Sequence, residues 1–89
     1  MAPRSFERLL KLPSEVALHA RPAADFVRTA MGFDSQIIVI NGDREADAKS
    51  LMSVLALGAD AGSELVVRAE GDDAPGAVDA LAGCVAKFG

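Results

Sequence analysis

The sequence predicts an α+β fold, a two-layer open-faced sandwich in which one antiparallel sheet carries helices on one face and water on the other. Three observations support this prediction. Segments with strand and helix periodicity follow one another in the order β-α-β-β-α-β-α, an Asn-Gly pair marks a hairpin, and single helical segments separate the remaining strands. The chain has 89 residues, 51% of them hydrophobic and 25% charged, which suits one globular domain over residues 1–89.

The chain begins with a predicted strand followed by a helix. Residues 5–12 are predicted as the strand because Phe6, Leu10 and Leu12 would share one face. A helix is expected over residues 20–31, and a glycine directly after it is a natural stop. The apolar residues that recur at helical spacing in this segment are Ala20, Ala23, Ala24, Val27, Ala30 and Met31.

A hairpin is expected after the first helix. Residues 36–40 are rich in β-branched side chains, and the Asn41-Gly42 pair that follows is the strongest short hairpin signal. Residues 43–48 would form the return strand. This strand is polar and weak, so we expect it at an edge of the sheet.

The second half of the chain contains two further helices and one strand. Ser50 can cap a short helix over residues 51–57. Residues 63–69 alternate as a strand, and residues 75–88 form the last helix. Pro75 falls in the first turn of that helix, where its missing N–H costs little.

Composition and charge exclude several classes of function. The net charge of −4 and the absence of tryptophan and tyrosine argue against nucleic-acid binding. The single cysteine, Cys84, permits neither an intramolecular disulfide nor zinc-ligand spacing, and we expect it to be a small buried residue. No metal or other cofactor is expected. No apolar run approaches the roughly 18 residues of a membrane span, and no signal core is present, so a cytoplasmic monomer without membrane insertion is expected.

One segment could carry chemistry, Leu18-His19-Ala20-Arg21-Pro22-Ala23-Ala24. His19, the only histidine, falls at the predicted start of the first helix. The first N–H groups of a helix have no internal acceptor and carry partial positive charge, which favours an anion such as phosphate. The same field favours the neutral, nucleophilic form of the imidazole. Arg21 adds a cation that can bind phosphate oxygens through two hydrogen bonds.

These residues by themselves indicate only a possible phosphate site. A solvent-exposed histidine near a helix cap, with an arginine nearby, is the more ordinary reason for the pattern, because spacing cannot separate a ligand from a bystander. The residues alone therefore leave both interpretations open.

Two motifs together resemble a known family. Leu18-His19-Ala20-Arg21-Pro22-Ala23 resembles the active-site signature of HPr, the phosphocarrier of the bacterial sugar phosphotransferase system. The segment from Ala48 to Gly58, Ala-Lys-Ser-Leu-Met-Ser-Val-Leu-Ala-Leu-Gly, is similar to the regulatory-serine segment of that family. The resemblance extends from about Phe6 to Phe88. Family members have a four-stranded antiparallel sheet of order 1-4-2-3 with three helices on one face, which agrees with the predicted order of elements.

The resemblance implies a relay of phosphate between proteins rather than an independent enzyme. His19 would be phosphorylated on Nδ1 by phosphorylated enzyme I, which draws on phosphoenolpyruvate, and would pass the group to IIA domains of sugar permeases. Arg21 would bind the phosphate together with the N–H groups of Ala20 and Arg21. Many members have a glycine two residues before the histidine. This chain has Ala17 there and Val16 before it, so these positions supply no polar group to orient the ring.

The second motif implies regulation and partner contacts. Ser50 resembles the serine that the HPr kinase phosphorylates in some bacteria, although a helix cap alone would also account for it. The resemblance further implies that an exposed apolar patch of Leu51, Met52 and Leu55 meets the partners. Arg28 and Lys49 are expected to add basic contacts at its rim. The alternatives are that the leucines belong to the core and that the two cations are merely solvated.

Two other functions compete with a carrier in the sugar branch. One is a regulatory HPr paralogue, such as a nitrogen-branch carrier or a domain of a multi-domain phosphotransferase protein, which would share His19 but respond to a different enzyme I. The other is a small interaction module without covalent chemistry, in which His19 would be dispensable. A self-contained enzyme is disfavoured because no Gly-rich nucleotide loop and no paired acid and base are present.

Overall fold

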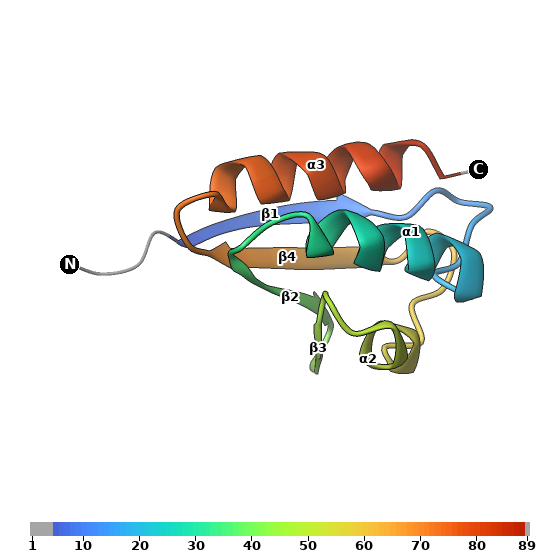
Figure 1. Cartoon of the computed structure of the whole chain (residues 1–89). Helices are drawn as coiled ribbons and strands as arrows, with labels where there is room; N and C mark the ends of the chain where they lie inside the picture. The colour runs from blue at the N-terminus through green and yellow to red at the C-terminus, as the bar shows by residue number, and fades with distance from the viewer. Residues whose placement is uncertain (1–4, 89) are drawn as a thin grey trace.

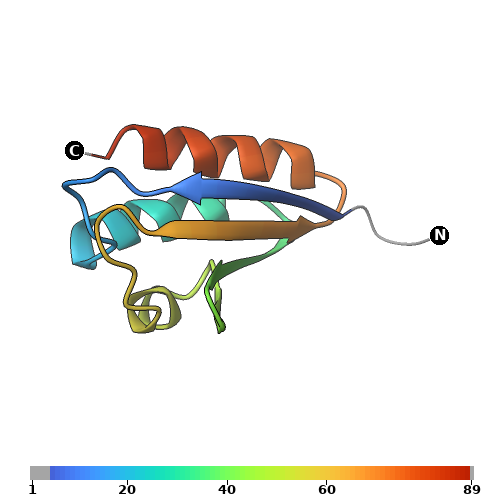
Figure 2. The same cartoon turned by 180° about the vertical axis from the view of Figure 1, so that it is seen from behind.

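The structure is a computed structural model that describes residues 5–88. Its elements follow the predicted order (Figure 1), and they are β1 (Ser5–Lys11), α1 (Ala20–Met31), β2 (Gln36–Asn41), β3 (Arg44–Asp47), α2 (Leu51–Ala56), β4 (Glu64–Glu70) and α3 (Ala74–Ala86). The strands form one antiparallel sheet in the order β1-β4-β2-β3. The helices lie on one side of it, so that β1 and β4 stand in front of α1 when the molecule is seen from behind (Figure 2). The predicted open-faced sandwich is confirmed.

The core lies between the sheet and the helices because alternate residues of each strand point toward α1 and α3. On β4, Leu65, Val67 and Ala69 are buried, while the residues between them are at least partly exposed. On β2, Ile37 and Val39 are buried in the same way. Twenty-two buried apolar residues among those described form one continuous cluster. Burial of this single cluster on the helical side leaves the other face of the sheet uncovered.

The first helix has its predicted bounds, but its buried face differs from the predicted stripe. The buried residues are Ala23, Phe26, Val27 and Ala30, which recur at intervals of three and four residues. Phe26 was absent from the prediction and is fully buried. Ala20 is exposed and Met31 is 65% exposed, because both lie outside the arc that faces the sheet.

The hairpin is shifted by one residue from the predicted turn. Asn41 is the last residue of β2 and pairs with Arg44, so the two turn residues are Gly42 and Asp43. Gly42 adopts a φ of 64°, which the first position of a type II′ turn requires and glycine tolerates. The return strand is shorter than predicted, and its place at the edge of the sheet is confirmed.

The last helix buries one face against the sheet and α1. Its buried residues are Ala74, Ala77, Val78, Leu81 and Val85. The prediction that Cys84 is buried is wrong, because Cys84 is only partly covered and lines a hollow between α1 and α3. Within residues 5–88, no helix has the length and apolar character that crossing a membrane requires.

Candidate functional site

His19 is the N-cap residue of α1, as the sequence predicts. Its backbone is extended (φ −95°, ψ −167°), and its carbonyl accepts a hydrogen bond of 2.8 Å from the Ala23 N–H. Its imidazole makes no capping hydrogen bond, although a side chain at this position commonly does. The residue is exposed. The ring is therefore accessible and is not committed to holding the helix.

Two backbone donors next to His19 remain available. The first N–H groups of a helix have no acceptor within it, and here they belong to Ala20 and Arg21, since Pro22 has none. The next residue along, Ala23, already donates to His19. The helix therefore presents two N–H donors, with the positive end of its dipole, beside the ring. This arrangement suits a group that carries negative charge.

A buried anchor sets the position of His19. Leu18 is 3% exposed, and its N–H donates to the Ala59 carbonyl at 3.0 Å. Ala59 is itself buried and directly follows Gly58, whose φ of 62° turns the chain after α2. The segment after α2 therefore supports the segment before α1. No local pattern in the sequence pointed to Ala59, because the contact joins two distant loops.

Val16 and Ala17, just before His19, supply no polar side chain for its ring. The Ala17 carbonyl accepts the His19 N–H at 2.9 Å, so Ala17 contacts the backbone of His19 and not its ring. Val16 lines the same open hollow as His19. The orientation of the imidazole therefore depends on the backbone of the 16–19 segment and on whatever group binds in the hollow.

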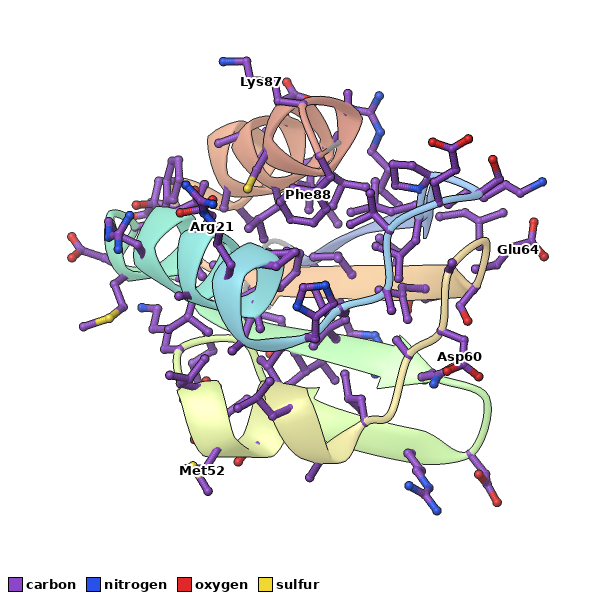
Figure 3. The ribbon with its side chains drawn as sticks, turned by 90° about the vertical axis from the view of Figure 1, so that its right-hand side faces the viewer. Arg21, Met52, Asp60, Glu64, Lys87 and Phe88 are labelled. Carbon is purple, nitrogen blue, oxygen red and sulfur yellow. The ribbon has the colours of Figure 1, made fainter. Side chains whose placement is uncertain are left out.

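The hollow at His19, of about 470 Å³, extends from α1 to the carboxyl end of α3. Its lining residues are Val16, His19, Arg21, Pro22, Asp25, Lys87 and Phe88. Arg21, on α1, and Lys87, at the end of α3, lie on the same side of the molecule in Figure 3. Sequence reasoning missed Lys87 and Phe88, since only the packing of α3 against α1 brings them near the histidine.

Arg21 and Arg28 differ in their charge environment. Arg28 forms an ion pair of 3.2 Å with Asp25, one turn earlier on the same helix. Within residues 5–88, Arg21 forms no ion pair, although it is exposed and adjoins the histidine. Arg21 therefore retains a guanidinium group that is free to bind an anion at His19.

Ser50 caps α2 as predicted. Its side chain accepts a hydrogen bond of 3.3 Å from the Ser53 N–H. The residue is half-buried, and its own N–H donates to the Asp47 carbonyl at 3.0 Å. The capping role is thus visible in the structure, and phosphorylation of Ser50 remains a separate hypothesis.

The predicted partner patch is only partly exposed. Met52 is 76% exposed and Leu51 is 39% exposed, while Leu55 is half-buried and packs against the core. Val54 occupies the inward position of this short helix. Lys49 is also engaged, because its ammonium donates to the Phe33 carbonyl at 2.6 Å, just beyond the end of α1. The exposed apolar part of the patch therefore consists of Leu51 and Met52.

Comparison with known proteins gives a consistent result. The family described as "PTS-HPr: PTS HPr component phosphorylation site" matches residues 6–87. The phosphocarrier protein HPr of Vibrio cholerae is 40% identical over 76 residues, which cover 85% of this chain and 89% of that protein. A multiphosphoryl transfer protein of Xanthomonas campestris is 49% identical over 70 residues, and this stretch spans only 8% of that longer protein.

Solved structures agree in fold. A crystal structure of an HPr from Thermoanaerobacter tengcongensis has 40% identity and a TM-score of 0.87, and 91% of each chain is covered. An HPr from Bacillus anthracis has 33% identity and a TM-score of 0.86, with 91% of this chain and 96% of that chain covered.

Proposed function

This chain belongs to the HPr family of phosphocarriers of the phosphotransferase system, and we propose that it carries a phosphoryl group on His19. Phosphorylated enzyme I would be the donor, and IIA domains of sugar permeases would be the acceptors. The observation that carries the proposal is the exposed, uncommitted ring of His19 beside two helix N–H groups and an Arg21 that have no partner among residues 5–88.

The proposed step is an in-line displacement at phosphorus. A ring nitrogen of His19 donates its lone pair to the phosphoryl group, the new N–P bond forms, and the bond between phosphorus and the donor group breaks with its electron pair. The two N–H groups of Ala20 and Arg21 and the Arg21 guanidinium stabilise the phosphoryl oxygens. In this type of transfer, positioning and charge stabilisation supply most of the catalysis. The second transfer runs the same step toward the acceptor.

The chain would act in this scheme as a relay without independent turnover. Nothing in the proposed step consumes a substrate of its own, since the phosphoryl group enters from one protein and leaves to another. The exposed Leu51 and Met52, with Arg28 at the rim, would contact these partners in turn. Weak, adaptable contacts through methionine suit a surface that several partners share.

Ser50 is proposed as a regulatory phosphorylation site for an HPr kinase. A phosphate there would stand at the amino end of α2, beside the exposed Leu51 and Met52. Its added charge beside this exposed apolar surface would weaken docking of enzyme I.

A second candidate is a regulatory HPr paralogue, such as a nitrogen-branch carrier or a domain of a multi-domain phosphotransferase protein. The observation in its favour is the 49% identity to the multiphosphoryl transfer protein of Xanthomonas campestris. This second candidate has the same phosphoryl transfer at His19 as the first, but the protein that donates the phosphoryl group is different. The two candidates therefore predict different rates with different forms of enzyme I.

The decisive experiment incubates the pure protein with enzyme I, magnesium and phosphoenolpyruvate and follows the intact mass. We expect a gain of about 80 Da, the mass of one phosphoryl group, that is labile in acid and absent from His19→Ala. The matched control, Ser50→Ala, should gain the same mass. Transfer from a nitrogen-branch enzyme I but not from the sugar-branch form would favour a regulatory carrier. Failure with every cognate enzyme I, using folded protein, would contradict the carrier function.

A further inference from the structure

The face of the sheet opposite the helices carries an aligned apolar strip. On β1, β4 and β2 the buried residues alternate with residues that point away from the helices. Leu9 pairs with Val66, and Val66 pairs with Ile40, so these three side chains form one row across three strands. Ile38 lies in the adjoining row, opposite Arg68. We call these four residues the open-face strip.

No part of residues 5–88 covers the open-face strip. Leu9 is 60% exposed, and Val66, Ile38 and Ile40 are each partly exposed. The residues on the uncovered side of an antiparallel sheet are ordinarily polar, because that side faces water. A contiguous apolar strip on such a face is typical of a surface that contacts another protein.

The residues around the open-face strip are mostly acidic. Within the part of the chain that the structure describes, the outward positions of the sheet carry two cations, Lys11 and Arg68, and five carboxylates. The carboxylates are Glu7, Glu45, Asp47, Glu64 and Glu70. A partner that covers the strip would therefore need cations around its own apolar contact.

The central cation of this face is already neutralised. Arg68 donates to the Glu7 carboxylate at 2.5 Å, and the two residues are direct neighbours on β4 and β1. The Glu7 carboxylate raises the pKa of Arg68 above its ordinary value, first through the hydrogen bond and then through its charge, with smaller contributions from Glu45 and Glu70. Arg68 is thus engaged by Glu7, and the other four carboxylates of the face are accompanied by one further cation, Lys11.

The strip also has a recess. A hollow of about 190 Å³ is lined by Gln36, Ile38, Arg68 and Glu70. Ile38 offers it an apolar wall and Glu70 an exposed carboxylate. A lysine or arginine side chain matches this combination, with its aliphatic stem on Ile38 and its charged end at Glu70, because the Arg68 guanidinium that also lines the hollow is paired with Glu7.

We propose that the open sheet face is a docking surface for a protein segment whose apolar side chains are flanked by lysine or arginine. Charge complementarity selects this partner over a second copy of the chain, since two copies placed face to face would oppose carboxylate to carboxylate. The surface is separate from the proposed phosphoryl site, because Arg21 and Glu64 lie on opposite sides of the molecule in Figure 3. A segment docked here would leave His19 accessible, so the proposal does not depend on the proposed function.

The test titrates isotope-labelled protein with an extended peptide of alternating lysine and valine and follows the amide resonances. We expect shifts on β1, β4 and β2, with binding that weakens as salt is raised. The same peptide with glutamate in place of lysine should not bind. The combined variant Leu9→Thr and Val66→Thr, which keeps good strand formers, should weaken binding about tenfold or more. The matched control Met31→Gln, a large exposed residue on α1, should leave binding unchanged.

Three outcomes would overturn the proposal. One is unchanged binding by the threonine variant, once its circular dichroism has shown it to be folded. Another is a set of shifts confined to α1 and α2, which would place the peptide at the His19 side. The third is a dimer of the free protein that the threonine variant abolishes, which would show that a second copy covers the strip. A double variant, Glu45→Gln with Glu64→Gln, tests the contribution of charge separately, because it should weaken peptide binding without altering any apolar contact.

Discussion

The carboxylate of Asp73 holds the loop before β2 through Ser35. Asp73 Oδ1 accepts the Ser35 N–H at 3.0 Å and also the Ser35 hydroxyl, and its Oδ2 accepts the Asp34 N–H at 2.8 Å. Ser35 is 3% exposed and is the one buried polar residue among those described. Three donors thus converge on one carboxylate and join the start of α3 to the start of β2.

Acid should weaken the fold through Asp73. The Ser35 hydroxyl and then the Asp34 N–H lower the pKa of Asp73 below its ordinary value of 3.8. Because the folded pKa is the lower one, the stabilisation is complete above the ordinary value and is lost as the pH falls through the folded pKa. In urea titrations, Asp73→Asn should unfold more easily than the native chain at pH 7. The difference should shrink below pH of about 4. Asp72→Asn, at an exposed neighbouring carboxylate, is the control, and an equal effect from it would contradict this role for Asp73.

Glycine at position 71 should be required for the same junction. Gly71 has a φ of 146°, and a Cβ there would lie 2.6 Å from Ser35 Oγ and 3.0 Å from Ser35 Cα. Gly71→Ala should therefore lower the free energy of unfolding by about 1–3 kcal/mol. Gly83→Ala is a matched control with the opposite sign. A Cβ at Gly83 meets nothing within 4 Å inside α3, so it should raise the free energy of unfolding by about 0.5–1 kcal/mol.

Arg21 should act on the rate of phosphoryl transfer rather than on docking alone. Arg21→Gln removes the exposed cation beside His19 and should lower the maximal rate about a hundredfold, as loss of one stabilising donor at a developing charge commonly does. Arg21→Lys should restore part of the rate. Rapid-quench measurement of transfer from enzyme I separates rate from affinity. Arg28→Gln, which breaks only a pair with Asp25 on the surface, should change the apparent affinity more than the rate.

Ser50 variants should separate capping from regulation. Ser50→Ala loses the hydrogen bond to the Ser53 N–H and should lower the free energy of unfolding by about 1 kcal/mol. Ser50→Asp keeps a capping oxygen and should be nearly as stable as the native chain, while its charge raises the KM for enzyme I. Thermal unfolding and transfer kinetics on both variants test this separation. Equal KM values for native protein and Ser50→Asp would argue against regulation through charge at this position.

Met52 should contribute to partner affinity and not to folding. Its side chain is 76% exposed, so Met52→Gln should change the free energy of unfolding by less than about 0.5 kcal/mol. The same substitution should raise the KM for enzyme I, because Met52 lies in the proposed contact surface. Val54→Ala, two residues away and fully buried, should show the reverse pattern, with a loss of stability of about 1–3 kcal/mol. Isothermal chemical denaturation and steady-state transfer kinetics distinguish the two patterns.

The sequence by itself determined the order of elements and the place of His19 at a helix start. These features depend on residues close together in the chain: the periodicity of residues 20–31, the proline at position 22 and the cap at Ser50. Predictions made from neighbouring residues alone were also the ones that placed boundaries wrongly. The Asn-Gly signal placed the hairpin turn one residue early, because only the pairing of Asn41 with Arg44 defines its register.

Tertiary structure alone decided which distant residues share a site. The Ala59 carbonyl accepts the Leu18 N–H, and the Asp73 carboxylate accepts the Ser35 N–H. Lys87 lines the same hollow as His19. Tertiary structure also aligned Leu9, Val66 and Ile40 into one uncovered row, since that row depends on the register of three strands. Helix and strand periodicity specify which face of an element is apolar, whereas contacts between elements depend on how all the faces pack together. No local pattern carries that information.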